Sequence, residues 1–208
     1  LMEAMWTRFL PHIVRVRELL AQGRLGSVRS LLADHGQWFP QDPKHRLFAP
    51  ELGGGALLDL GIYPVSFASM IFGRPSKVTA VSDPAFTGVD AQTGMLFQYS
   101  AGQQAVLFTS LETRTANQAV INGTEARIEI DGVFYAPSNF RVIDRDGAVE
   151  HFDVPHEGQG LRHQAAEVGR CLRAGRAESE IMPLDETIAI METLDEIRGQ
   201  IGLKYPSE

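Results

Sequence analysis

The sequence predicts an α+β fold in which a large, mainly antiparallel open β-sheet carries helices on one face. Seven β-prone segments follow one another between residues 77 and 154, and short turn sequences such as Asn122-Gly123 and Asp146-Gly147 separate them. Such short turns join antiparallel neighbours, whereas parallel strands need long crossovers. Helical patterns lie before and after this run and do not alternate with it, which favours helices gathered on one side of the sheet.

Size and composition bound the class of protein. With 208 residues, of which 44% are hydrophobic and 22% charged, the chain can bury a sizeable core. The net charge of −7 argues against a nucleic-acid partner, and no run approaches the roughly 18 apolar residues of a membrane span. A single cysteine, Cys171, and no apolar leader favour a reducing compartment. We therefore expect a cytoplasmic protein with a small-molecule partner.

The first 24 residues are interpreted as a strand followed by a helix. The opening segment LMEAMWTRF is typical of a strand, and Pro11 stands at the favourable first position of the helix that follows. Glycines at 23 and 26 end this helix. Because Leu1 is not an initiator methionine and the strand pattern is already in progress there, we expect a truncated chain.

The elements of the main sheet follow in order. Residues 25–37 are interpreted as a strand and residues 38–51, with three prolines, as a long loop. A helix is predicted at 56–72, and two more, at 161–174 and 184–201, close the chain. The predicted strands between them are 77–82, 94–99, 104–111, 116–122, 125–130, 140–144 and 148–154.

The helix at 56–72 begins with the motif GGGALLDLGIYP. Its residues are almost all apolar, which predicts burial on several sides. Asp59, Tyr63 and Ser66, spaced i, i+4 and i+7, form one narrow polar stripe. This stripe either hydrogen-bonds to the sheet backbone or faces a ligand, and the three glycines allow a backbone or a ligand to approach closely. Pro64 is expected to break or kink the helix near its own position.

Two motifs carry a family resemblance, WTRFLP at residues 6–11 and GGGALLDLGIYP at residues 53–64. With the run of strands and the two closing helices, they resemble the C-terminal part of the glucose-fructose oxidoreductase and inositol dehydrogenase family, and within it the dimeric dihydrodiol dehydrogenases. The resemblance covers the chain from end to end. It implies an NAD(P)-dependent oxidoreductase that transfers hydride between nicotinamide and a secondary alcohol or carbonyl of a sugar, polyol or dihydrodiol.

The same resemblance implies a division into domains. Family members hold NAD or NADP in an N-terminal dinucleotide-binding domain, yet these residues contain neither a G-x-G-x-x-G after a strand nor a Glu-Lys-Pro sequence. Residues 1–24 are accordingly expected to be a remnant of that domain, the last strand and helix of a Rossmann-like fold. Residues 25–208 are expected to form the substrate and dimerisation domain. We expect no NAD or NADP to bind to this chain alone, and a homodimer through the open sheet face.

The resemblance also assigns roles to individual residues. Tyr63 takes the proton-donor role, which suits carbonyl reduction because a phenol with a pKa of about 10 is protonated at neutral pH. Asp59 is expected to orient the substrate hydroxyl or the tyrosine. Trp6 and Arg8 are candidates for the substrate pocket. His35 is a further candidate, not from the resemblance but because it ends a predicted strand just before the long loop. On competing interpretations Trp6 is core between two domains, Arg8 forms a surface ion pair, and His35 is a solvated or core histidine.

Two other interpretations compete with this assignment. His151, Asp153, His156 and Glu157 lie close together in the sequence, but Pro155 interrupts their spacing and no zinc motif accompanies them, so no metal site is predicted. A second function class is a non-catalytic module for dimerisation or small-ligand binding. Sequence upstream of Leu1 with a glycine fingerprint would favour the enzyme over the module.

Overall fold

The computed structural model describes residues 1–206 and 208, and its centre is one eight-stranded sheet. The strands lie in the order β2-β3-β4-β1-β5-β6-β7-β8, and every neighbouring pair is antiparallel except β1 and β4. The predicted mainly antiparallel open sheet is therefore confirmed. The strand bounds are β1 Val28–Gly36, β2 Lys77–Pro84, β3 Asp90–Gln98, β4 Gln104–Ser110, β5 Ala119–Gly123, β6 Ala126–Ile130, β7 Phe140–Asp144 and β8 Val149–Phe152.

The parallel pair β1 and β4 sets the topology. Two parallel neighbours cannot be joined by a tight turn, so the chain leaves β1 through a long loop, passes through a helix and the β2–β3 hairpin, and returns as β4. Because β1 lies between β4 and β5, its C-terminal end lies near the middle of the sheet and not at one of its edges.

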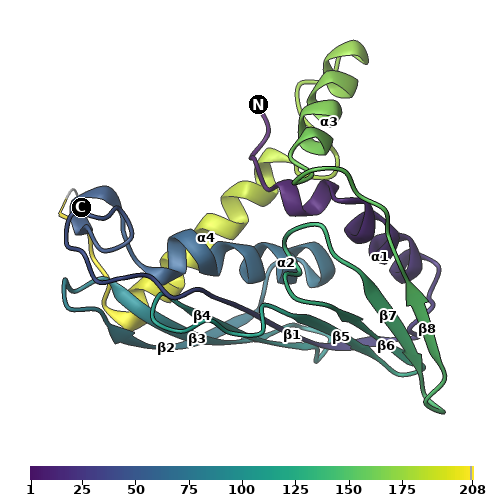
Figure 1. Cartoon of the computed structure of the whole chain (residues 1–208), viewed down its shortest axis with the longest axis horizontal. Helices are drawn as coiled ribbons and strands as arrows, with labels where there is room; N and C mark the ends of the chain where they lie inside the picture. Colours follow the sequence, from purple (N-terminus) through teal and green to yellow (C-terminus); the bar gives the residue numbers. More distant parts are fainter. Residues whose placement is uncertain (207) are drawn as a thin grey trace.

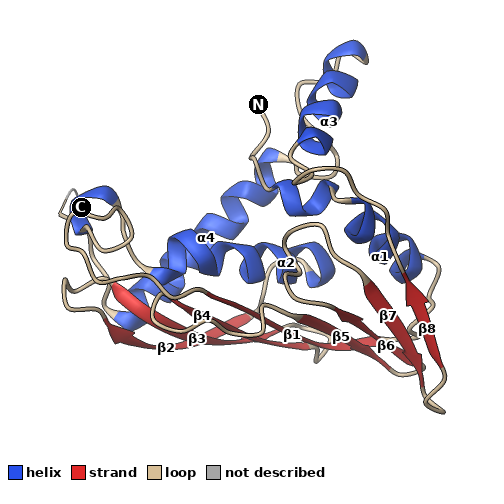
Figure 2. Ribbon diagram, viewed as in Figure 1, coloured by secondary structure: helices blue, strands red, loops and turns tan. Residues whose placement is uncertain are grey.

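Helices cover one face of the sheet, as Figure 2 shows, and the other face carries none among the residues described. Helices α1 (Pro11–Ala21), α2 (Ile62–Phe72) and α4 (Leu184–Ile201) lie over the sheet, whereas α3 (Arg162–Arg173) points away from it (Figure 1). All four predicted helices are confirmed. The apolar side of α1 joins the same core as the sheet, with Ile13 and Val16 fully buried.

The segment around α2 is the most apolar part of the chain. By length and composition Pro50–Phe72 could cross a membrane, with a mean hydropathy of 1.5, but 56% of its most apolar stretch is buried inside the fold. Leu57, Val65 and Phe67 pack into the main core between the sheet and the helices that cover it (Figure 2). Burial between the sheet and α4 accounts for this composition.

The predicted opening strand is wrong. Residues Trp6–Phe9 form a short 3-10 helix, η1, in which three consecutive residues, Thr7, Arg8 and Phe9, are buried. A strand alternates its faces and could not bury three neighbours in this way unless it lay inside a sheet. Here the sheet ends at β2 and β8, and Thr7 instead donates its hydroxyl to the Tyr135 carbonyl.

Three strand starts also differ from expectation by more than one residue, since β1 begins at Val28 and not at 25, β3 at Asp90 and not at 94, and β5 at Ala119 and not at 116. The strand predicted at 116–122 begins at Ala119, because Asn117 adopts a left-handed φ of 55° that a strand does not permit. Its side-chain amide exchanges hydrogen bonds with the backbone of Gly36 at 3.1 Å each way. The Asp34 carboxylate accepts from the Asn117 backbone N–H at 2.7 Å. These contacts fix the end of β1 beside the site described next.

Candidate functional site

The predicted polar stripe faces a cleft. A cavity of about 370 Å³ lies between the α2 region, α4 and the N-terminal segment, and Asp59, Tyr63 and Ser66 all contribute to its wall. Apolar residues make up most of the remainder, so the cleft combines a few polar groups with an apolar lining. The other lining residues are Glu3, Ala4, Met5, Leu58, Ile62, Met182, Thr187, Ile190, Met191 and Leu194.

The helix that carries the stripe is irregular one turn before Pro64, not at it. Residues Leu57–Gly61 form a π-helical turn, η3, and α2 continues from Ile62 without a break through Pro64. Proline has no N–H, so the carbonyl of Leu60 lacks its usual helical donor. The Nδ1 of His35 lies 3.1 Å from that carbonyl oxygen and supplies the missing hydrogen bond.

Two of the three glycines of the motif, Gly54 and Gly55, are required by close packing. Gly55 has a φ of 120°, and a Cβ added there would lie 2.1 Å from an Asp90 carboxylate oxygen. A Cβ on Gly54 would lie 2.8 Å from the Leu47 carbonyl oxygen. The other Asp90 oxygen accepts from the Leu57 N–H at 2.8 Å, which caps the first turn. The close approach that the glycines allow is therefore used by the protein itself.

Asp59 pairs with a residue that sequence reasoning did not identify. Its Oδ1 lies 2.5 Å from Nη1 of Arg46, on the long loop after β1. Nη2 of Arg46 also donates to Oδ2 of Asp59 at 3.3 Å, and the two side chains are 63% and 28% exposed, so the pair lies at the protein surface. Nothing in the sequence around Arg46 distinguishes it, because the contact joins a loop to a helix.

Tyr63 is half-buried and lies in an aromatic cluster. Its hydroxyl accepts from Nε1 of Trp6 at 3.3 Å, which links η1 to α2. Its ring lies 5.1 Å from that of His35 in an edge-on arrangement and 4.9 Å from that of Tyr135. The structure thus brings together Trp6, His35 and Tyr63, three of the five residues that the sequence singled out.

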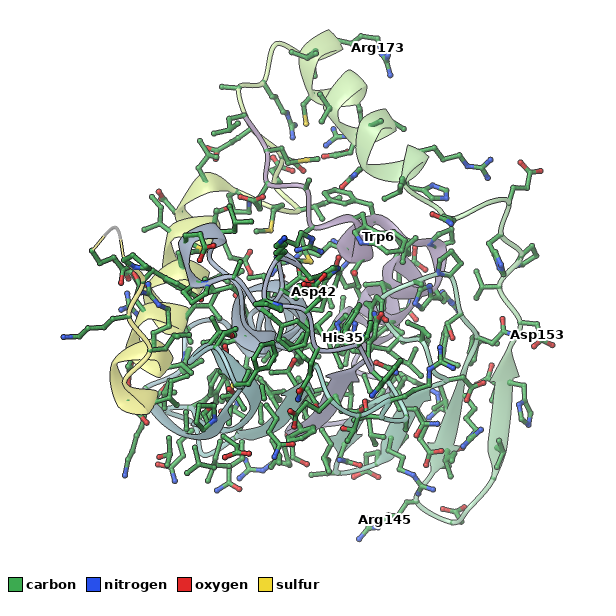
Figure 3. All side chains as sticks on the ribbon, turned by 60° about the vertical axis from the view of Figure 1, so that its left-hand side comes forward. Trp6, His35, Asp42, Arg145, Asp153 and Arg173 are labelled. Atoms are coloured by element: carbon green, nitrogen blue, oxygen red, sulfur yellow. The ribbon has the colours of Figure 1, made fainter. Side chains whose placement is uncertain are left out.

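His35 is buried at the end of β1 and does not line the cleft. Burial lowers the pKa of its imidazole to about 4, although the Leu60 carbonyl, Asp59 and Asp34 all favour the charged form. At neutral pH the ring is therefore uncharged. Figure 3 labels Trp6 and His35 toward the middle of the molecule, whereas Arg145 lies at the tip of the β7–β8 hairpin.

Arg8 is held within the fold. Its Nη2 lies 2.6 Å from Oε1 of Glu186 on α4, and its side chain is only 3% exposed. The same guanidinium donates to the carbonyls of Ile181 and Ser66. All three of its nitrogens have partners, so in this structure the group joins η1, α2 and α4, and it is not part of the cleft wall.

Two further residues belong to the cluster. Tyr135 follows β6, and its ring lies 3.9 Å from that of His35 with a 30° tilt. The Gln37 amide nitrogen lies 3.0 Å from Nε2 of His35 and 3.1 Å from the Tyr135 hydroxyl. Burial raises the pKa of the Tyr135 phenol, which therefore stays protonated. No sequence signal near either residue indicates the site, because sheet topology alone brings them together.

The region of His151 to Glu157 forms β8 and the loop that follows it. Across the described part of the chain, no three His, Cys, Asp or Glu side chains gather as metal ligands would.

Comparison with known proteins identifies the family. The family model described as "GFO/IDH/MocA C-terminal domain" matches residues 13–129. Trans-1,2-dihydrobenzene-1,2-diol dehydrogenase of Xenopus tropicalis is 38% identical over 216 residues, and the human enzyme of that name is 34% identical over 218. D-xylose 1-dehydrogenase (NADP(+)) of Hypocrea jecorina is 33% identical and covers 99% of this chain. The chain itself spans 64% of the length of the two diol dehydrogenases and 61% of the third enzyme.

Solved structures show the same fold. Aldose-aldose oxidoreductase from Caulobacter crescentus, complexed with glycerol, superposes with a TM-score of 0.85 at 25% identity, covering 96% of this chain and 61% of that one. A 3-ketoreductase from Actinomadura kijaniata, in complex with NADP and TDP-benzene, has a TM-score of 0.80 at 23% identity and covers 97% of this chain and 62% of its own.

Proposed function

Because the chain belongs to the family of GFO/IDH/MocA C-terminal domains, we propose that it is the substrate-binding part of an NAD(P)-dependent oxidoreductase. The reaction is hydride transfer between nicotinamide and a secondary alcohol or carbonyl of a sugar, polyol or dihydrodiol. The observation that carries this proposal is Tyr63, a phenol held by Trp6 on the wall of a cleft. The names of the relatives, dihydrodiol and xylose dehydrogenases, support the substrate class.

The proton chemistry follows from the position of Tyr63. Nicotinamide, when bound, supplies or accepts the hydride. In carbonyl reduction the substrate oxygen becomes an alkoxide, and the Tyr63 hydroxyl gives it a proton. In the opposite direction the phenolate takes the proton, and the Trp6 N–H that points to its oxygen stabilises the negative charge. Asp59, paired with Arg46, offers a carboxylate that accepts a hydrogen bond from a substrate hydroxyl.

The described residues offer groups suited to the nicotinamide end of such a cofactor, but no site for its phosphates. A phosphate cradle needs free backbone N–H groups at a glycine-rich turn. In the GGG turn the Asp90 carboxylate and the Leu47 carbonyl already fill the space beside Gly55 and Gly54. We place the dinucleotide phosphates in a part of the protein outside these 208 residues, with residues 1–24 as the junction to it and 25–208 as the substrate domain.

We further propose a cytoplasmic homodimer that pairs through the uncovered sheet face. A row of partly exposed apolar residues crosses four neighbouring strands, with Leu96 opposite Val106, Val106 opposite Leu32 and Leu32 opposite Val120. Leu32 and Val106 are 47% and 51% exposed. A continuous apolar row on an open sheet is typical of an isologous interface.

The alternative is a non-catalytic module for dimerisation or ligand binding. Tyr63→Phe, made in the protein with its dinucleotide domain, separates the two because it keeps the ring and deletes only the proton. We expect cofactor affinity to persist and turnover to fall roughly 10²-fold or more. Tyr99→Phe is the matched control, since the buried Tyr99 hydroxyl has no hydrogen-bond partner among the described residues. Near-normal turnover in Tyr63→Phe would show that the phenol is structural.

A further inference from the structure

The histidine next to Tyr63 has a defined tautomer. The Leu60 carbonyl that Pro64 leaves without a helical donor can only accept a hydrogen bond, so Nδ1 of His35, 3.1 Å away, must carry a proton. The carbonyl belongs to the π-helical turn directly before Tyr63. His35 thereby holds the segment that sets the position of the tyrosine.

The other ring nitrogen confirms this tautomer from the opposite side. The Gln37 amide nitrogen has two hydrogens, and its two neighbours are Nε2 of His35 at 3.0 Å and the Tyr135 hydroxyl at 3.1 Å. An amide nitrogen only donates, so Nε2 accepts and carries no proton. The imidazole is therefore neutral, with each nitrogen engaged.

The rings are fixed as well. The His35 ring meets Tyr63 edge-on, with an interplanar angle of 77°, and lies against Tyr135 at 3.9 Å. Tyr63 and Tyr135 also touch, at 4.9 Å between centroids. Edge-on and offset contacts of this kind are the favoured geometries of aromatic pairs. The imidazole thus supports Tyr63 through its ring and through its Nδ1 proton.

We propose that His35 is a positioning residue for Tyr63, fixed as the neutral Nδ1–H tautomer between the Leu60 carbonyl and the Gln37 amide. The consequence for turnover rests on the function proposed above, but the tautomer and the geometry do not. The charged groups near His35 are Asp34 on its own strand and Asp59 on the π-helical turn, and both favour the cation. Burial outweighs them, so the imidazole stays neutral at physiological pH.

The tautomer is tested in this chain alone by long-range ¹⁵N–¹H NMR of the histidine rings between pH 5.5 and 8. We expect one neutral signal set for His35 with the proton on Nδ1 throughout. A proton on Nε2, or titration near pH 6.5, would overturn the proposal.

Gln37→Glu tests the network that holds the ring. A carboxylate accepts where the amide donated, so Nε2 must now bind a proton and the titration midpoint of His35 should rise by about 1 pH unit or more. Gln98→Glu, which adds the same charge at an exposed position on β3, is the control and should leave His35 unchanged. An unchanged midpoint in Gln37→Glu would contradict the contact.

The positioning role is tested with two substitutions in the protein that carries its dinucleotide domain. His35→Asn keeps a donor at the Nδ1 position, and His35→Phe keeps the ring and loses the donor. We expect His35→Phe to lower kcat about tenfold with KM within about twofold, and His35→Asn to recover part of that loss. Normal kcat in both variants, in a protein whose Tyr63→Phe variant is inactive, would refute positioning while leaving the proposed function standing. If Tyr63→Phe is also fully active, the proposed function fails independently of the NMR result.

Discussion

Arg8 and Glu186 form an ion pair that joins the N-terminal segment to the last helix, with 2.6 Å between Nη2 and Oε1. The Arg8 side chain is 3% exposed and that of Glu186 24%. Ser69 donates its hydroxyl to the same carboxylate oxygen at 2.7 Å, and Ser66 accepts from the guanidinium. The pair therefore lies within a hydrogen-bond network between η1, α2 and α4. Loss of the Glu186 charge would leave the buried Arg8 cation without a counter-charge.

Glu186→Gln should destabilise the chain by about 3 kcal/mol, because it leaves the buried Arg8 cation without its counter-charge. Arg15→Met is the control, since Arg15 and Glu18 pair at the surface with 41% and 51% of their side chains exposed. That loss should stay below about 1 kcal/mol. Urea unfolding of both variants measures the difference, and equal effects would show that the Arg8 pair is no stronger than a surface pair.

Arg8 and Tyr63 differ in how far local sequence patterns predict their surroundings. The strands of the main sheet and the four helices follow from local signals, namely apolar periodicity and turn residues, and these are confirmed, whereas the opening strand is not. The polar stripe of Asp59, Tyr63 and Ser66 also follows from helical spacing, and all three face the cleft. The family resemblance made Arg8 a candidate for the pocket, whereas its partner in the structure, Glu186, lies 178 positions away, and no local pattern reveals such a contact.

The same limit explains the remaining differences. Tyr135 and Gln37 join the cluster only because the sheet topology brings the loop after β6 to the end of β1. The opening segment has the composition of a strand, yet it has no strand edge to pair with and forms a 3-10 helix instead. Tertiary contacts override local preference in both cases.

Acid should destabilise the fold through two buried histidines. Burial lowers the pKa of His12 and of His35 to about 4, below the value of 6.5 expected in the unfolded chain. Their contribution to stability is complete above pH 6.5 and is lost as the pH falls through about 4. Asp90 acts in the opposite sense, because burial raises its pKa from 3.8 to about 6 and its contribution is lost as the pH rises through 6.

The histidines outweigh Asp90, so we expect the free energy of unfolding to fall by about 3 kcal/mol between pH 7.5 and pH 4. Urea unfolding at several pH values measures this slope. In Asp90→Asn the opposing contribution is absent, and the fall in acid should be steeper. A chain that becomes more stable on acidification would show that these histidines are not held neutral.

The apolar row on the open sheet should control self-association. Val106→Lys places a charge at the centre of the row, opposite Leu32 and Leu96, and should weaken a dimer at least roughly tenfold. Leu172→Lys makes the same exchange on α3, at a side chain that is 71% exposed and far from the sheet face. Light scattering over a range of concentrations distinguishes the two. A wild-type chain that stays monomeric at high micromolar concentration would refute the proposed homodimer.

The last prediction concerns the dinucleotide. Its pyrophosphate requires backbone N–H groups at a glycine turn and the N-terminus of a helix, free to face a ligand. In the GGG turn before the helix, the Asp90 carboxylate occupies the space beside Gly55, where its negative charge would repel a phosphate. The Tyr205 hydroxyl closes the other side by donating to the Gly54 carbonyl at 2.7 Å. We therefore expect calorimetric titration to give a Kd above about 1 mM for the binding of NAD(H) and NADP(H) to the 208-residue chain.

The protein that includes the dinucleotide domain serves as the positive control. Micromolar binding to the 208 residues alone would show that the chain contains a phosphate site of its own, and the assignment of Gly54 and Gly55 to close packing within the protein would then be wrong.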